Sequence, residues 1–250
     1  MAESALALRE HPQIIELLSV LEQNSLSKQK EEVQALVGYI DGMEEKLSQM
    51  MDEMKAMRLE VEKLHDKGIR ARCAQLVGTA EGKIRQGKTM LSTARTNFVS
   101  AAGRMLGTFQ EKGRAALRHA VQALRIPSVL SRMGRGFAHA EKSMGQLAVR
   151  LDAMREELHQ AGGHIKNAGL ALAGKEPQKS KELSADKGVL AKLRSFVLYC
   201  GKAFSEMDRD TALTVERINS GRSSAKTELQ GLKSAQTGQR RQAASKEQAR

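Results

Sequence analysis

Residues 130–172 read LSRMGRGFAHAEKSMGQLAVRLDAMREELHQAGGHIKNAGLAL, with apolar residues spaced alternately three and four positions apart. One row of this pattern contains Leu130, Phe137, Met144, Leu151, Leu158, Ile165 and Leu172, and the other contains Met133, Ala140, Leu147, Met154, Ala161 and Ala168. A spacing that averages about 3.5 residues keeps one stripe of a helix facing a neighbouring helix over many turns. The stretch therefore predicts a long helix packed along a partner helix.

A second ladder of the same kind precedes the first. We call its apolar residues the N-terminal seam: Val33, Leu36, Ile40, Met43, Leu47, Met50, Met54, Met57, Val61 and Leu64. Charged residues such as Glu53 and Arg58 flank the seam, as is typical of two-helix coiled coils. The pattern predicts self-association through this seam, with an intramolecular hairpin as the alternative. The methionines in the seam specify register and oligomer state weakly.

The flanks of residues 130–172 are small instead of charged, with glycines and alanines beside the apolar rows. Small flanking residues permit more than one helix to approach closely, which favours an antiparallel bundle or hairpin there. We call its large apolar positions the bundle seam: Leu130, Phe137, Met144, Leu151, Met154, Leu158 and Ile165.

The composition predicts an all-α, elongated fold. Aromatic residues make up 3% of the 250 residues, Trp is absent, and the chain has 12 Met and 3 Pro. Such a chain has few of the large rings that fill compact cores, and alternating strand patterns are also missing. No stretch is apolar enough over about 20 residues to predict a transmembrane helix. A secretory leader is not recognisable either, so we expect a cytoplasmic protein.

Breaks in these patterns divide the chain into six expected segments. They are a short N-terminal helix (1–26), an acidic coiled-coil helix (27–81), a basic amphipathic helix joined to the heptad-patterned helix (82–173), a linker (174–187), a C-terminal helix (188–220) and a disordered basic tail (221–250). Pro12 and Pro127 suit the first turns of helices, and Ser27 is a candidate cap. Gly68 is expected to interrupt the coiled-coil helix.

Charge is distributed unevenly along the chain, whose formal net charge is +12. Residues 1–81 carry 10 Lys/Arg and 15 Asp/Glu, residues 82–150 carry 13 and 2, and residues 151–250 carry 18 and 12. The candidate anion-binding arginines of the middle segment are Arg85, Arg104, Arg114, Arg118, Arg132 and Arg135. They indicate sequence-independent attraction to a nucleic-acid backbone, or attraction of the basic amphipathic helix to an anionic membrane surface. The alternative is that the apolar face packs in the bundle and the charges are only solvated.

Recognisable catalytic and cofactor motifs are missing from the sequence. The single Glu156-x-x-His159 pattern is half of what a di-iron bundle needs, and Cys73 and Cys200 are far apart in sequence. Neither a nucleotide-binding loop nor a nucleophile elbow is present. We therefore expect a non-enzymatic protein without cofactor, metal site or small-molecule substrate.

Two stretches resemble an uncharacterised helical family. They are HPQIIELLSVLEQNSLSKQKEEVQALVGYIDGMEEKLSQM at residues 11–50 and GGHIKNAGLALAGKEP at residues 162–177. Members of this family are encoded on integrative and conjugative elements of gut Firmicutes, and the likeness covers most of residues 10–220. The resemblance implies a cytoplasmic accessory role in a mobile genetic element and brings no established activity, ligand or catalytic residue.

Taken together, these patterns predict a scaffold or adaptor that self-associates through the N-terminal seam or binds a helical protein partner. A sequence-independent nucleic-acid-binding protein is the alternative, and a peripheral binder of anionic membranes is the third hypothesis.

Overall fold

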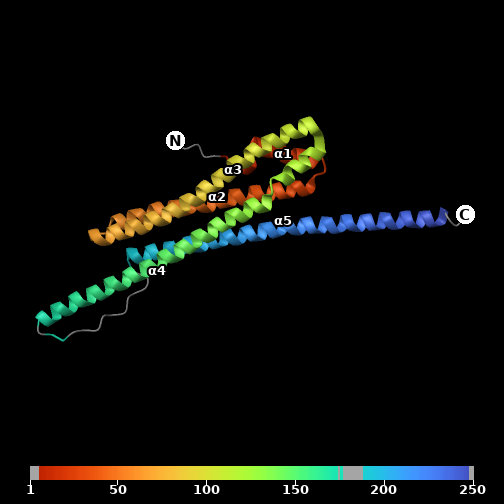
Figure 1. Cartoon of the computed structure of the whole chain (residues 1–250). Helices are drawn as coiled ribbons and strands as arrows, with labels where there is room; N and C mark the ends of the chain where they lie inside the picture. The colour runs from red at the N-terminus through yellow and green to blue at the C-terminus, as the bar shows by residue number, and fades with distance from the viewer. Residues whose placement is uncertain (1–5, 174, 177–187, 248–250) are drawn as a thin grey trace.

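The computed structural model describes residues 6–173, 175–176 and 188–247, with side chains described up to Ser220, and within these residues the fold is all-α (Figure 1). The elements are the 3-10 helix η1 (Leu8–Glu10) and the helices α1 (Pro12–Gln23), α2 (Ser27–Glu62), α3 (Lys67–Ala123), α4 (Ile126–Leu172) and α5 (Val189–Glu247). The predicted all-α, elongated fold is confirmed.

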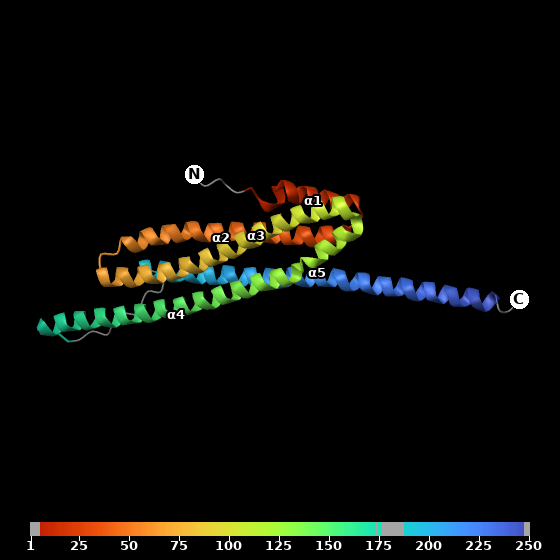
Figure 2. The ribbon, with the colours of Figure 1, turned by 45° about the horizontal axis from the view of Figure 1, so that its top comes forward.

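Two long helical hairpins form the body of the molecule. Helix α2 packs along α3, helix α4 packs along α5, and α2 also contacts α5. The short helix α1 lies on α2 and α3 near the end where α3 turns into α4 (Figure 2). The C-terminal part of α4 projects beyond the bundle at one end, and the C-terminal part of α5 projects at the other (Figures 1 and 2).

The N-terminal seam faces the inside of this bundle. Eight of its ten residues are buried, and Met57 and Leu64 are partly buried against the same core. Among the described elements, α2 contacts η1, α1, α3, α4 and α5, which cover this seam. The packing therefore corresponds to the intramolecular alternative, and a second chain would reach this seam only if the bundle opened.

The bundle seam is buried along α5 for most of its length. Leu130, Phe137, Met144, Leu151 and Met154 are buried, and Leu158 is partly buried. The prediction is wrong for Ile165, which is 75% exposed, and Leu172 at the end of the same row is 92% exposed. The physical reason is that α5 begins at Val189 and its Arg194 already pairs with Asp152 of α4, so the last turns of α4 have no described helix beside them.

Helix ends follow local chemistry that the sequence indicated in part. Pro12 and Pro127 lie in the first turns of α1 and α4, as predicted. The predicted cap at Ser27 is wrong, because Ser27 is the first residue of α2, Leu26 occupies the cap position, and no side chain caps the helix. The break expected at Gly68 instead precedes α3, where Asp66 Oδ1 accepts a hydrogen bond of 2.8 Å from the Ile69 amide.

Buried polar side chains of α2 form hydrogen bonds to η1 and to α5. The Asp41 carboxylate of α2 accepts a 2.6 Å hydrogen bond from the Leu8 amide and so anchors η1. The Tyr39 hydroxyl of α2 shares a short hydrogen bond with the Thr211 hydroxyl of α5, and Thr211 donates to the Met207 carbonyl at 2.7 Å. Burial raises the pKa of Tyr39 well above its usual value, so this contact between the two hairpins is made by a neutral phenol.

The C-terminal region differs from its prediction. Helix α5 continues as one helix to Glu247, where the sequence predicts a disordered tail from residue 221. Residues 221–247 contain no Pro and many Ala, Gln, Lys and Arg residues, which favour helix. Most of the predicted linker, residues 174 and 177–187, lies outside the described residues.

Helix α3 bends at Gly113, whose backbone has φ +75° and ψ −166°. This conformation is open almost only to glycine, and a Cβ at this position would meet no atom within 4 Å. The Gly113→Ala variant should therefore lose about 1–2 kcal/mol of unfolding free energy through backbone strain alone. Urea unfolding followed by circular dichroism measures this loss.

The matched control is Gly107→Ala, six residues earlier in α3. Gly107 also has open space around its Cβ position, but its backbone is helical. Alanine there should raise the free energy of unfolding by about 0.5–1 kcal/mol. Equal stabilisation by both alanines would contradict the assigned role of Gly113 as the bend.

Candidate functional site

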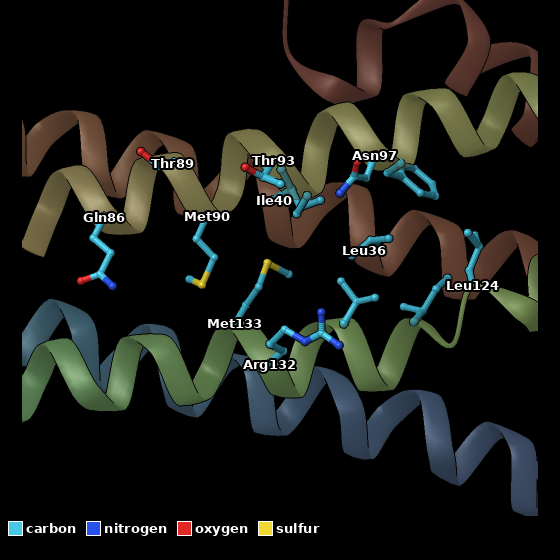
Figure 3. Close-up of a pocket in the computed structure, with 14 residues that line it drawn as sticks. Leu36, Ile40, Gln86, Thr89, Met90, Thr93, Asn97, Leu124, Arg132 and Met133 are labelled. Carbon is cyan, nitrogen blue, oxygen red and sulfur yellow. The ribbon is translucent and has the colours of Figure 1, made fainter.

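A groove of about 600 Å³ lies between α2, α3 and α4 (Figure 3). Its apolar lining comes from three helices and the turn between α3 and α4: Leu36, Ile40, Met90, Ala94, Phe98, Leu124, Ile126, Val129 and Met133. Leu36 and Ile40 belong to the N-terminal seam and form the α2 side of the groove. A mostly apolar hollow of this volume is in the range of sites for small molecules.

Polar side chains of α3 line the groove together with one arginine of α4. Gln86, Thr89, Thr93 and Asn97 follow one another along α3 at helical spacing, and Arg132 faces them from α4 (Figure 3). Arg132 is the only charged residue in the lining. Hydrogen-bonding groups beside an apolar hollow fix the orientation of a bound molecule, whereas the apolar wall supplies most of the contact.

Close contacts between the hairpins determine where the groove lies. At Gly87 of α3, a Cβ would lie 3.2 Å from Leu47 Cδ1 and 3.7 Å from Phe137 Cε1, so the two hairpins nearly touch there. The turn at Leu124 and Ile126 joins α3 to α4 at the other end. The groove occupies the space between these two connections.

The six candidate arginines do not form one surface. Arg85 is held by Glu81 of the same helix at 2.6 Å, and Arg132 lines the groove. Arg104, Arg114 and Arg118 lie on either side of the bend at Gly113, and all three are exposed. Arg135 is exposed on α4. The number of residues between Arg85 and Arg104 corresponds to roughly 28 Å along the helix axis.

We call the exposed cations around the bend the basic end: Arg104, Lys112, Arg114, Arg118 and Arg125. Among the described side chains none of them forms an ion pair, although Arg114 Nη2 lies 3.4 Å from the Ser25 carbonyl oxygen. Glu111 is the only acid of residues 104–125. By contrast, Arg95 of the same segment is held by Glu44 at 2.8 Å, so the acidic segment neutralises part of the basic one.

The far part of α5 projects past the basic end. Figures 1 and 2 both show this part of α5 extending beyond the turn between α3 and α4. Residues 221–247 contain six Lys/Arg and two Glu. Two basic stretches separated by about 100 positions in the sequence therefore lie at the same end of the molecule.

A family model described as "Family of unknown function (DUF6674)" matches residues 10–250. The chain belongs to the DUF6674 family. Comparisons of this DUF6674 protein with curated proteins and with solved structures give no match.

The described residues of the DUF6674 protein contain neither a metal cluster nor a membrane-spanning helix. Within the described ranges, no three His, Cys, Asp or Glu side chains are grouped so that they could hold a metal ion. No described helix has both the length and the apolar character needed to cross a membrane. Cys73 and Cys200 are buried and free, and burial raises the pKa of the Cys200 thiol to about 12.

Sequence reasoning missed the groove, although a pattern for it exists. The uncharged polar residues at 86, 89, 93 and 97 form a row on α3 next to the apolar row that contains Met90, Ala94 and Phe98. Such a row in an otherwise basic segment indicates a surface of different character. The opposite wall could not be inferred, because it depends on where α4 lies.

Proposed function

We propose that the DUF6674 protein is a non-enzymatic helical protein that binds the phosphate backbone of nucleic acids through its basic end. The observation that carries this proposal is the group of exposed cations around Gly113 without an ion pair among the described residues. Cations held on a rigid helix displace condensed counterions from a polyphosphate, which gives binding without sequence preference. The scarcity of aromatic residues argues against base stacking as the main contact.

Helix α5 supports the same proposal. Its residues 221–247 correspond to roughly 40 Å of helix, which is about the length of one turn of a DNA duplex. This segment has a net excess of Lys/Arg and extends from the same end of the bundle. The basic end and residues 221–247 together would contact more phosphates than the basic end alone.

Duplex binding should fall steeply with salt. If the basic end contacts about five phosphates, affinity should drop about 10²–10³-fold between 50 and 200 mM salt, measured by fluorescence anisotropy with a labelled duplex. The Arg104→Gln/Arg114→Gln/Arg118→Gln variant should bind more weakly and have a salt slope smaller by about 2–3.

The control for this variant is Arg85→Gln. Arg85 is an exposed arginine of the same helix that already pairs with Glu81, so its loss should change the salt slope little. Absence of binding to duplex and single strand at about 50 mM salt would overturn the proposal. So would equal loss of affinity in the triple variant and in Arg85→Gln.

Anionic membranes are a less suitable partner for the same cations. The apolar face that would insert into a membrane contains Phe98, Leu106 and Phe109. Phe98 and Leu106 are buried in the bundle, and Phe109 is partly buried against it. An amphipathic helix binds a bilayer through an exposed apolar face, which this part of α3 does not present.

Self-association is the second candidate function, and one observation favours it. The exposed end of α4 continues the bundle seam through Ile165 and Leu172, with Ala161 and Ala168 in the neighbouring row. A heptad stripe that has no described helix beside it, and that has small neighbours, suits a helix from another copy of the chain. We therefore propose this end of α4, instead of the N-terminal seam, as the contact of a scaffold.

Sedimentation velocity over a range of concentrations tests self-association. Wild-type protein should form dimers that the Ile165→Lys/Leu172→Lys variant loses, because the charges would be buried without partners. Val149→Lys is the control, since Val149 is 69% exposed on α4 but lies outside both seam rows. A wild-type monomer at every concentration would contradict this candidate.

The genomic and cellular setting is also a proposal. The resemblance of residues 11–50 and 162–177 to proteins of integrative and conjugative elements supports an accessory role in a mobile element. In that setting the protein would act in the cytoplasm, where element DNA is accessible. Loss of duplex binding would remove the physical reason for this role.

A further inference from the structure

We propose that the groove between α2, α3 and α4 binds an amphiphile with one carboxylate and a single apolar chain, of the fatty-acid class. The lining of the groove carries this proposal, which is independent of nucleic-acid binding. The hollow has room for an apolar chain, and the one charge in its lining is suited to a carboxylate.

The hollow suits an unbranched apolar chain. Its volume of about 600 Å³ exceeds what one or two side chains would fill, and its inner wall is made by buried Leu36, Ile40 and Phe98. Met90 and Met133 approach the groove from α3 and α4 (Figure 3). Methionine side chains are flexible and polarisable, so they adapt to chains of different length.

The position of Met90 is itself constrained by the opposite helix. A Cβ on Gly136 of α4 would lie 2.8 Å from Met90 Sδ, so the glycine leaves room for this side chain beside the groove. Alanine at position 136 would therefore displace the Met90 side chain.

The single charge suits a carboxylate. Arg132 is the only charged group of the lining, it is exposed, and it forms no ion pair with any described side chain. Guanidinium binds carboxylate through two parallel hydrogen bonds. Thr93 and Asn97 lie on the α3 side of the groove, across from Arg132 (Figure 3).

A partner helix fits the groove less well. An α-helix is about 10 Å across and rises 5.4 Å per turn, so a hollow of about 600 Å³ would hold fewer than two turns. Docked helices usually anchor through residues spread over at least two turns. The volume of the groove is therefore in the range of small-molecule sites.

The test uses the full chain and sodium dodecanoate below its micelle concentration. Since the chain has no Trp, the Thr93→Trp variant places a single fluorophore beside the groove. Its emission should change on titration with dodecanoate and saturate at one molecule per chain. The Tyr199→Trp variant, with an exposed reporter on α5 outside the groove, should not respond.

Two comparisons separate the contributions of tail and head. Octanoate should bind on the order of 100-fold more weakly than dodecanoate, because each methylene contributes about fourfold. In isothermal titration calorimetry, Arg132→Gln should weaken dodecanoate about tenfold and leave dodecanol unchanged, since only the former can pair with the guanidinium. The matched control is Arg135→Gln, an exposed arginine of α4 outside the lining, which should bind like wild type.

Three results would overturn the proposal. The first is no saturable binding of dodecanoate to the wild-type chain in calorimetry. The second is an equal response of the Thr93→Trp and Tyr199→Trp reporters. The third is equal weakening by Arg132→Gln and Arg135→Gln, which would mean general attraction to the positive chain. Far-ultraviolet circular dichroism of every variant should match the wild type and so exclude misfolding as the cause.

Discussion

We expect the Phe137→Ala variant to lose about 3–5 kcal/mol of unfolding free energy. Phe137 is fully buried in α4, and its ring lies 6.1 Å from the ring of Phe204 in α5 at an interplanar angle of 26°. Its edge also approaches Gly87 of α3, where the two hairpins meet. Removal of the ring leaves a cavity at a point where three helices converge, and helices cannot collapse fully into such a space.

Urea denaturation monitored by circular dichroism measures this effect, with the midpoint as the primary reading. Val149→Ala is a suitable control, because Val149 lies on the same helix and is exposed. Its replacement should change the free energy of unfolding by less than about 0.5 kcal/mol. If Phe137→Ala and Val149→Ala had similar midpoints, the contact of α4 with α5 and Gly87 could not be as described.

The second large effect concerns Gly134, a buried glycine where α4 crosses α5. A Cβ there would lie 2.8 Å from Asp208 Oδ1 and 3.0 Å from Thr211 Cγ2, both of α5. The Gly134→Leu variant should therefore lose about 2–3 kcal/mol, because its side chain forces the helices apart. The gain in helix propensity, about 0.8 kcal/mol, offsets only part of this loss.

The Gly145→Ala variant measures the gain in helix propensity without a steric clash between α4 and α5. Gly145 is in the same helix, and a Cβ at this position meets nothing within 4 Å. Alanine there should raise the free energy of unfolding by about 0.5–1 kcal/mol, measured in the same urea experiment. A Gly134→Leu variant as stable as wild type would show that α4 and α5 do not approach closely at Gly134.

Heptad spacing predicted the helices but did not identify which helices would cover their apolar stripes. The rows that begin at Val33 and Leu130 correspond to α2 and α4, and most of their residues are buried. An apolar stripe indicates that another helix packs against it. The spacing of the stripe is the same whether that helix belongs to another chain or is α5 of the same chain. Ile165 shows the second limit, because the pattern continues past the point where α5 begins.

The candidate arginines were predicted as a group from composition and helical angle. In the folded chain these arginines lie in different surroundings. Arg85 pairs with Glu81, four residues earlier in α3. Arg132 lines the groove, because the turn at Leu124 directs α4 along it. The Glu81–Arg85 spacing was readable in the sequence as an intrahelical pair. The bend at Gly113 was not, because a glycine within a helical pattern is usually tolerated without a break.

The hydrogen bond between Tyr39 and Thr211 has a consequence for the order in which the protein is made. It joins residues 172 positions apart, and α5 also covers Phe137 and Met144 of α4. During synthesis on the ribosome, α2 to α4 emerge before α5 and expose these apolar side chains to solvent or to chaperones. A nascent chain that stops before Val189 would therefore be prone to aggregation, and release of the last helix completes the core.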